Sequence, residues 1–196
     1  MLTNNETQSD QATHMLDTLE AIYANANRLI ESVTPEQRHI QTPCSEWDTH
    51  ALVNHMTGTC NVLGAAARRE TPASTPDDDH FGDQDPPAAF AAAAAANLEA
   101  WRSPGALDGE ISVPIPMPAM AGLGVNILDI GTHCWDLATT IGADHGLTDE
   151  MIATIDQWNR AVVNDEIRAG GGFAPALEPS SDDALAAMLA YTGRPA

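Results

Sequence analysis

The chain has 196 residues, enough for a core of ordinary size, and we predict a single domain over residues 1–196. It carries 28 acidic and only 8 basic residues, a net charge of −20. This charge argues against nucleic acid and anionic membrane as partners, because both would be repelled.

Neither targeting signals nor disulfides are expected. No apolar run approaches the roughly 20 residues that cross a bilayer, and the first residues are polar and acidic, unlike a signal peptide. The cysteines, Cys44, Cys60 and Cys134, are odd in number and widely spaced, which does not fit a disulfide framework or a structural zinc ribbon. We therefore predict a cytoplasmic protein.

The first two predicted helices have regular apolar faces. Residues 11–32 keep helical spacing of apolar side chains over about five turns. The second helix is predicted to begin at a cap formed by Ser45 or Asp48 and to end near residues 68–69. His55 lies at the edge of its apolar face, where it could reach across a groove between packed helices. A boundary histidine with one hydrogen bond is the alternative.

The middle of the chain is less regular. Residues 70–85 are predicted to form a surface loop, and its acidic run, residues 77–80, lacks the spacing of a calcium loop and is interpreted as solvated charge. A third helix is predicted from Pro86 or Pro87 to Trp101. The proline-rich residues 103–120 are predicted to be an extended connection with room for a short edge hairpin.

The fourth predicted helix, residues 123–141, carries the strongest chemical pattern in the sequence. Asp129 and His133 are one turn apart on a polar stripe that flanks an apolar one, so a carboxylate and an imidazole can point at one spot beside the core. A solvated or mutually hydrogen-bonded pair is the alternative.

The last part of the chain is predicted to be helical as well. One helix is expected over residues 148–168, begun by a Thr148 cap and ended by a glycine run, and a short one over residues 180–191. No alternation long enough for a sheet is present. The predicted fold is therefore all-α, an up-and-down four-helix bundle with a proline-rich extended connection and a short C-terminal helix.

Several short blocks follow one another in a distinctive order: Thr42-Pro43-Cys44, Glu46-Trp47-Asp48, Leu52-Val53-Asn54-His55, Asp129, His133-Cys134-Trp135-Asp136-Leu137-Ala138 and Gly193-Arg194-Pro195. Together they resemble the DinB-like metalloprotein superfamily, and more narrowly the branch related to the N-terminal domain of mycothiol-dependent maleylpyruvate isomerase. The resemblance covers nearly the whole chain.

This resemblance implies one divalent metal, held by a histidine of the second helix and an acid-x-x-x-histidine pair of a later helix. Position by position these ligands are His55, Asp129 and His133. Zinc is the first expectation, and nickel, iron or manganese could use the same ligands, because two histidines and one carboxylate select weakly among these ions. Trp47 and Trp135 are interpreted as packing residues, and Asp136 as a support of the site or the partner of an arginine.

The function implied by the resemblance is that of a metal-dependent thiol S-transferase-like enzyme. A low-molecular-weight thiol such as mycothiol would be activated as a metal-bound thiolate, or a metal-bound water would act instead. Isomerase activity is not expected to carry over. The isomerase-like pattern has Glu where this chain has Asp129, and the isomerase has a further C-terminal domain that contributes to its active site.

Alternatives from other classes stay open. The chain could be a non-catalytic metal- or small-molecule-binding protein of stress or resistance, or a cysteine enzyme with Cys44 as a nucleophile of lowered pKa. It could also be a bundle whose polar boundary residues bind no metal. An alanine-rich bundle face could pair with a second copy. Scarce cations could bind an anionic substrate group or form salt bridges: Arg102, Arg160, Arg168 and Arg194.

Overall fold

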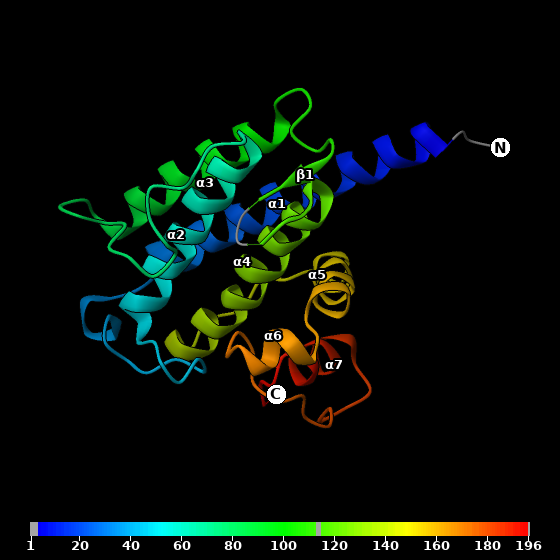
Figure 1. Ribbon diagram of the computed structural model, residues 1–196. Helices are drawn as coiled ribbons and strands as arrows, with labels where there is room; N and C mark the ends of the chain where they lie inside the picture. Colours follow the sequence, from blue (N-terminus) through cyan, green and yellow to red (C-terminus); the bar gives the residue numbers. More distant parts are fainter. Residues whose placement is uncertain (1–3, 113–114, 196) are drawn as a thin grey trace.

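The computed structural model describes residues 4–112 and 115–195, and within these residues the chain is predominantly α-helical, as predicted (Figure 1). The long helices form a bundle, and shorter helices follow it. The helices are α1 (Asn4–Glu31), α2 (Thr49–Ala67), α3 (Pro86–Arg102), α4 (Ala119–Ile141), α5 (Asp149–Val162), α6 (Asp165–Ala169) and α7 (Ala184–Tyr191), with a 3-10 turn at Pro35–Gln37. Residues 1–3 and 196 of the predicted domain lie outside the described part.

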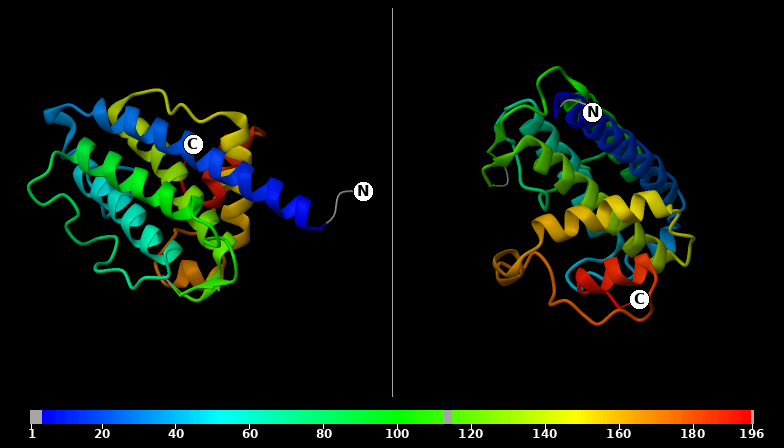
Figure 2. Two further views of the ribbon diagram at one scale, coloured as in Figure 1. Left: turned by 90° about the horizontal axis from the view of Figure 1, so that it is seen from above. Right: turned by 90° about the vertical axis from the view of Figure 1, so that its right-hand side faces the viewer.

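The bundle pairs two parallel helices with two others that run in the opposite direction (Figures 1 and 2). In the first pair, Tyr23 of α1 bonds with Asn126 of α4, and Arg28, later in α1, reaches Asp144 just beyond the end of α4. The later residue of α1 thus contacts the later residue at α4, so both helices run in the same direction. α1 and α4 are therefore parallel neighbours.

The second pair, α2 and α3, is parallel for the same reason. Val53, early in α2, lines a pocket together with Pro86 at the start of α3, and Cys60, later in α2, accepts a hydrogen bond from Asn97 of α3. The connection over residues 68–85 is long enough to return the chain to the end of the bundle where α2 begins. Long crossovers of this kind allow consecutive helices of a bundle to run parallel. The helical bundle is as predicted, but α2 and α3 do not alternate in direction as the predicted up-and-down order would require.

Capping residues explain where several helices begin, and they also explain why one predicted helix is divided in two. Asp48 caps α2, since its carboxylate accepts from the backbone N–H of Ala51 at 2.8 Å. The single helix predicted over residues 148–168 is wrong, because the chain is extended at Val163, where α5 ends, and a new helix, α6, begins at Asp165. Asn164 caps α6 by accepting from two backbone N–H groups, which favours a fresh helix start over continuation.

The proline-rich connection contains the short hairpin for which the sequence left room. β1 (Glu110–Ile111) pairs antiparallel with β2 (Met117–Pro118), and α4 begins directly after it at Ala119. The buried Ile111 side chain packs against the Gly122 backbone and so fixes the hairpin on α4. Val113 and Pro114, also predicted as extended, lie outside the described residues.

α4 is the central element of the structure, in contact with α1, α2 and α5. Its apolar stripe is buried as predicted; Ile127, Ile130, Cys134 and Leu137 are fully inaccessible. The polar stripe beside it therefore faces the groove toward α2. In the ranges that the structure describes, no helix is both long and apolar enough to cross a membrane.

Candidate metal centre

The structure brings the three predicted ligands together at the α2–α4 groove. His55 projects from α2, and Asp129 and His133 project from consecutive turns of α4. The Asp129 Oδ2 atom lies 3.3 Å from His55 Nε2 and 3.9 Å from His133 Nε2. One ligand atom from each residue lies within 4.8 Å of the others, so the three can face a common point.

The dimensions of this group suit a small divalent ion. Ligand atoms about 2.0–2.2 Å from a tetrahedral zinc ion lie roughly 3.3–3.6 Å apart, close to the distances between Asp129 and the two imidazoles. The Asp129 Oδ1 atom is buried without a hydrogen-bond partner, which leaves part of this carboxylate free for a cation. Although an Asp side chain is one methylene shorter than Glu, Asp129 reaches both imidazoles.

Each of the two histidines has a second carboxylate on its other ring nitrogen. His55 Nδ1 lies 2.8 Å from Asp77 Oδ1, and His133 Nδ1 lies 2.8 Å from Asp136 Oδ2. An ionised carboxylate only accepts hydrogen bonds, so each Nδ1 carries a hydrogen, and a ring that loses its second proton has its lone pair on Nε2. Carboxylate–histidine pairs of this kind orient metal ligands and make them more basic.

The electrostatics of the group reflect the crowding of charges. Burial by itself lowers the pKa of His55, but the carboxylates of Asp129 and Asp77 raise this pKa to about 9. Burial has the opposite effect on Asp129, but the two neighbouring imidazoles hold the pKa of its carboxyl below the usual value. Without a metal, the His55–Asp129 contact is therefore an ion pair at neutral pH.

Trp47 forms a wall of the group and does more than fill the core. Its indole stacks on the His55 ring, with centroids 4.1 Å apart and planes at 28°, and meets His133 edge-on at 5.5 Å. The ring restricts the rotation of both imidazoles and covers them from solvent. Trp135, the other predicted packing residue, is half-buried against the core.

A second buried cluster adjoins His133 on the side away from Asp129. Asp136 is fully buried and binds Arg194 through two hydrogen bonds of 2.7 Å, while Cys44 Sγ donates to its Oδ2 atom at 3.3 Å. Asp136 thus both supports His133 and pairs with an arginine, the two roles that the sequence left open. Burial opposes ionisation, but His133 and Arg194 hold the pKa of Asp136 far below its usual range.

The geometry does not fit Cys44 as a nucleophile of lowered pKa. Cys44 precedes the first residue of α2 by a full turn of irregular chain, and burial together with the Asp136 carboxylate raises the pKa of its thiol to about 12. His133 Nδ1 is 4.0 Å from the sulfur but is already bonded to Asp136. A thiol in these surroundings stays protonated at neutral pH.

Sequence reasoning missed Asp77. The run at residues 77–80 was interpreted as solvated charge, and Asp77 is indeed mostly exposed, yet the loop folds back on α2 and brings this carboxylate to His55. Gly58 permits the approach, since a Cβ atom there would lie 2.2 Å from the Pro76 carbonyl oxygen. A glycine three residues after His55 was the available signal.

The scarce arginines named above are engaged within the chain. Arg102 pairs with Glu20, and Arg160 pairs with Asp156. Arg168 donates to backbone carbonyls, including that of Tyr191, and Arg194 binds Asp136 as described. Their observed contacts therefore correspond to structural roles.

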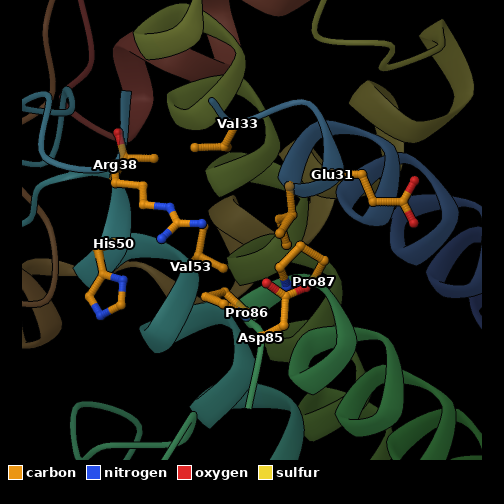
Figure 3. Close-up of a pocket in the computed structure, with 10 residues that line it drawn as sticks. Glu31, Val33, Arg38, His50, Val53, Asp85, Pro86 and Pro87 are labelled. Carbon is orange, nitrogen blue, oxygen red and sulfur yellow. The ribbon is translucent and has the colours of Figure 1, made fainter. Parts of the chain in front are cut away.

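Two pockets of the structure lie away from the metal-ligand candidates. One, of about 220 Å³, opens where α1 ends and α2 and α3 begin; Figure 3 shows Arg38 and His50 on one side of it and Asp85, Pro86 and Pro87 on another. The other lies along the last turns of α3. Neither is lined by any of the three candidate ligands.

Comparisons with known proteins identify the family. Residues 19–138 match the mycothiol maleylpyruvate isomerase N-terminal domain. Two proteins of Mycobacterium tuberculosis, from different strains and both named only as uncharacterized, are 32% identical to this chain over 174 residues, covering 85% of this chain and 91% of their own length. No solved structure matches. The chain belongs to the family of the mycothiol maleylpyruvate isomerase N-terminal domain.

Proposed function

We propose that this protein is a divalent-metal-dependent enzyme that activates a low-molecular-weight thiol, in the manner of a thiol S-transferase, with His55, Asp129 and His133 as the metal ligands. The observation that supports the proposal is the convergence of two Nε2 atoms on the half-buried Asp129 carboxylate, which keeps one buried oxygen without a partner. The family match supports the thiol, since its description names mycothiol.

A set of three protein ligands would leave a coordination position of the metal open for a substrate. Three protein ligands are typical of catalytic metal sites, in which a further position is open, whereas structural zinc sites are closed by four. Zinc is the first candidate, and nickel, iron or manganese suit the same donors. A divalent ion held there would supply Lewis acidity, which lowers the pKa of a thiol and favours its thiolate at neutral pH.

The protein residues around the ligands have definable tasks. Asp77 and Asp136 orient the two imidazoles, and Trp47 shields them from water. In an S-transfer the sulfur would form a bond to an electrophilic carbon, while the leaving group departs with the electron pair of the broken bond. No side chain other than the ligands is assigned a catalytic role.

Elemental analysis of the purified, untagged protein tests the metal site. About one equivalent of a transition metal is expected in the native chain, and none in His55→Ala or His133→Ala. His50→Ala serves as the matched control, because His50 is an exposed histidine on the same helix and touches none of the three ligands. A folded protein without metal that also takes up no added zinc or nickel would refute the proposal.

The thiol is tested on the cobalt-loaded protein. A low-molecular-weight thiol that binds cobalt as its thiolate produces a sulfur-to-cobalt charge-transfer band, and a chromogenic haloarene then reports S-transfer. The alternative is a non-catalytic metal- or small-molecule-binding protein of stress or resistance. Two pockets that none of the three ligands line could bind a small molecule apart from the metal, which favours it. Stoichiometric metal binding without any response to thiols would select that alternative.

A further inference from the structure

The C-terminal segment reaches the candidate metal centre through one side chain. Arg194 follows α7 in sequence, and only 8% of its surface is exposed. Gly193 makes the necessary turn with a φ of +80°, and a Cβ atom at this position would lie 2.6 Å from the Ala174 side chain. A glycine is therefore required where the chain turns to bury the guanidinium.

The buried guanidinium saturates the carboxylate of Asp136. Its Nε atom donates to Oδ1 and its Nη2 atom to Oδ2, both at 2.7 Å, and Oδ2 also accepts from His133 Nδ1 at 2.8 Å. A bidentate arginine–carboxylate pair has a fixed plane and holds the carboxylate ionised. Asp136 thus accepts from His133 in one orientation only, which directs His133 Nε2 toward Asp129.

The same guanidinium stands beside a second set of potential ligands. Cys44, His133 and Asp136 each offer one atom within 4.8 Å of the others, a group that could in principle hold a soft divalent ion. However, Arg194 Nη2 lies 3.3 Å from Cys44 Sγ as well as 2.7 Å from Asp136 Oδ2. A cation bound there would meet the positive guanidinium at close range, so the pairing with Arg194 disfavours it.

We propose that Arg194 is a positioning residue that restricts His133 to a single metal position. Through Asp136 it orients His133 Nε2 toward the ion shared with His55 and Asp129. Its positive charge also keeps an ion away from Cys44. This inference rests on the proposed metal site. It adds that the affinity and the position of the metal depend on a side chain from the far end of the chain, 58 residues beyond the carboxylate that it binds.

Cobalt titration of the full-length protein tests the proposal. In Arg194→Met the affinity for cobalt is expected to fall by about tenfold, the low end of the effect of losing an outer-shell partner, because Arg194 acts on His133 only through Asp136. A sulfur-to-cobalt charge-transfer band, absent in the native protein, is expected to appear as the thiol of Cys44 becomes a ligand. Arg194→Lys, which keeps the charge but loses the planar fork, is expected to recover part of the affinity.

Arg168→Met is the matched control. Arg168 also fixes the C-terminal segment, by donating to the Tyr191 carbonyl, but it does not touch Asp136. Circular dichroism and thermal unfolding establish that each variant is folded. If Arg194→Met fails to fold, Arg194→Lys carries the test, with weaker cobalt binding than the native protein as the expected result.

The outcomes separate the two proposals. Weaker binding or a new charge-transfer band in an Arg194 variant, with neither change in Arg168→Met, supports the role of Arg194. Native affinity and spectrum in the folded Arg194 variants, an equal loss in Arg168→Met, or a charge-transfer band already present in the native protein overturns it while leaving the metal site intact. A native protein that binds no cobalt overturns both.

Discussion

Two polar clusters lie in the bundle on neighbouring turns of α4, and they differ in charge. The first is a neutral cluster: Tyr23, Asn97, Trp101 and Asn126. The Tyr23 hydroxyl lies 2.8 Å from Asn97 Oδ1, and Trp101 Nε1 donates to Asn126 Oδ1 at 3.1 Å. Partners from three helices satisfy the other side-chain polar atoms, while Asn126 Nδ2 is buried without a partner, and the cluster specifies how α1, α3 and α4 pack.

The second is a charged cluster: His55, Asp129, His133, Asp136 and Arg194. One part of it, Asp136 with its three donors, is saturated. The other part is not, because Asp129 Oδ1 is buried without a partner while two imidazole nitrogens crowd its other oxygen. Leaving a buried carboxylate oxygen unpaired costs free energy unless something binds it. Each cluster leaves one buried atom unpaired, Asn126 Nδ2 in the neutral one and Asp129 Oδ1 in the charged one, but only Asp129 carries charge and faces two imidazole nitrogens. The contrast teaches that charge beside an unpaired atom, and not the unpaired atom alone, marks a place for a cation.

The largest effect that would test this contrast is expected from Asp129. Asp129→Ala removes the shared carboxylate and should abolish stoichiometric metal binding, whereas Asp129→Glu, which restores the longer acid, should retain it. Metal content after exhaustive dialysis is the measurement. Full metal content in Asp129→Ala would show that the unsaturated part of the charged cluster is not a metal site.

The next largest effect is expected in how the stability of the metal-free protein depends on pH. Because the pKa of His55 is raised from 6.5 to about 9 by its carboxylate neighbours, its protonated form stabilises the folded state fully below the unfolded pKa. Between pH 6.5 and 8.5 the free energy of unfolding should therefore fall by about 2 kcal/mol. Denaturant unfolding at several pH values measures the slope. His55→Gln should flatten it, and an equal slope in that variant would remove His55 as the cause.

A substitution in the neutral cluster should lower the stability of the fold without changing its metal content. Tyr23→Phe deletes a hydroxyl that bonds to Asn97 and Asn126, and the lost pairing should destabilise the fold by about 1–2 kcal/mol. Metal content should stay at the native level, since the hydroxyl touches none of the candidate ligands. Urea unfolding and elemental analysis on one preparation give both numbers. A loss of metal at unchanged stability would contradict the separation of the two clusters.

The smallest effect is expected from Asp77. Asp77→Asn weakens the hydrogen bond to His55 Nδ1 at an exposed position, so metal affinity should fall by at most about tenfold, the low end for an outer-shell partner. Asp78→Asn is the control in the same loop, because Asp78 bonds to Thr75 and not to His55. Competition with a chelator of known affinity resolves a change of this size.

Helical periodicity predicted most of the fold, because it records which face of each segment is buried. The stripe through Ile127 and Leu137 predicted the inner face of α4, and capping chemistry at Asp48 and Thr148 predicted helix starts. It did not predict the break after α5. Asn164 competes for the backbone locally, and whether that competition wins depends on the rest of the structure.

The sequence by itself determined the helical elements, the buried stripes and the one-turn spacing that stacks Asp129 and His133, because all of these depend on neighbours within a few residues. Helical spacing also placed His55 at the edge of a groove, and the resemblance joined it to that pair as a third ligand. Only the tertiary structure decided that Asp77 meets His55 and that Arg194 meets Asp136, since these contacts join segments 22 and 58 residues apart. Which distant side chains meet depends on helix directions and loop paths, and no local pattern in the sequence encodes them.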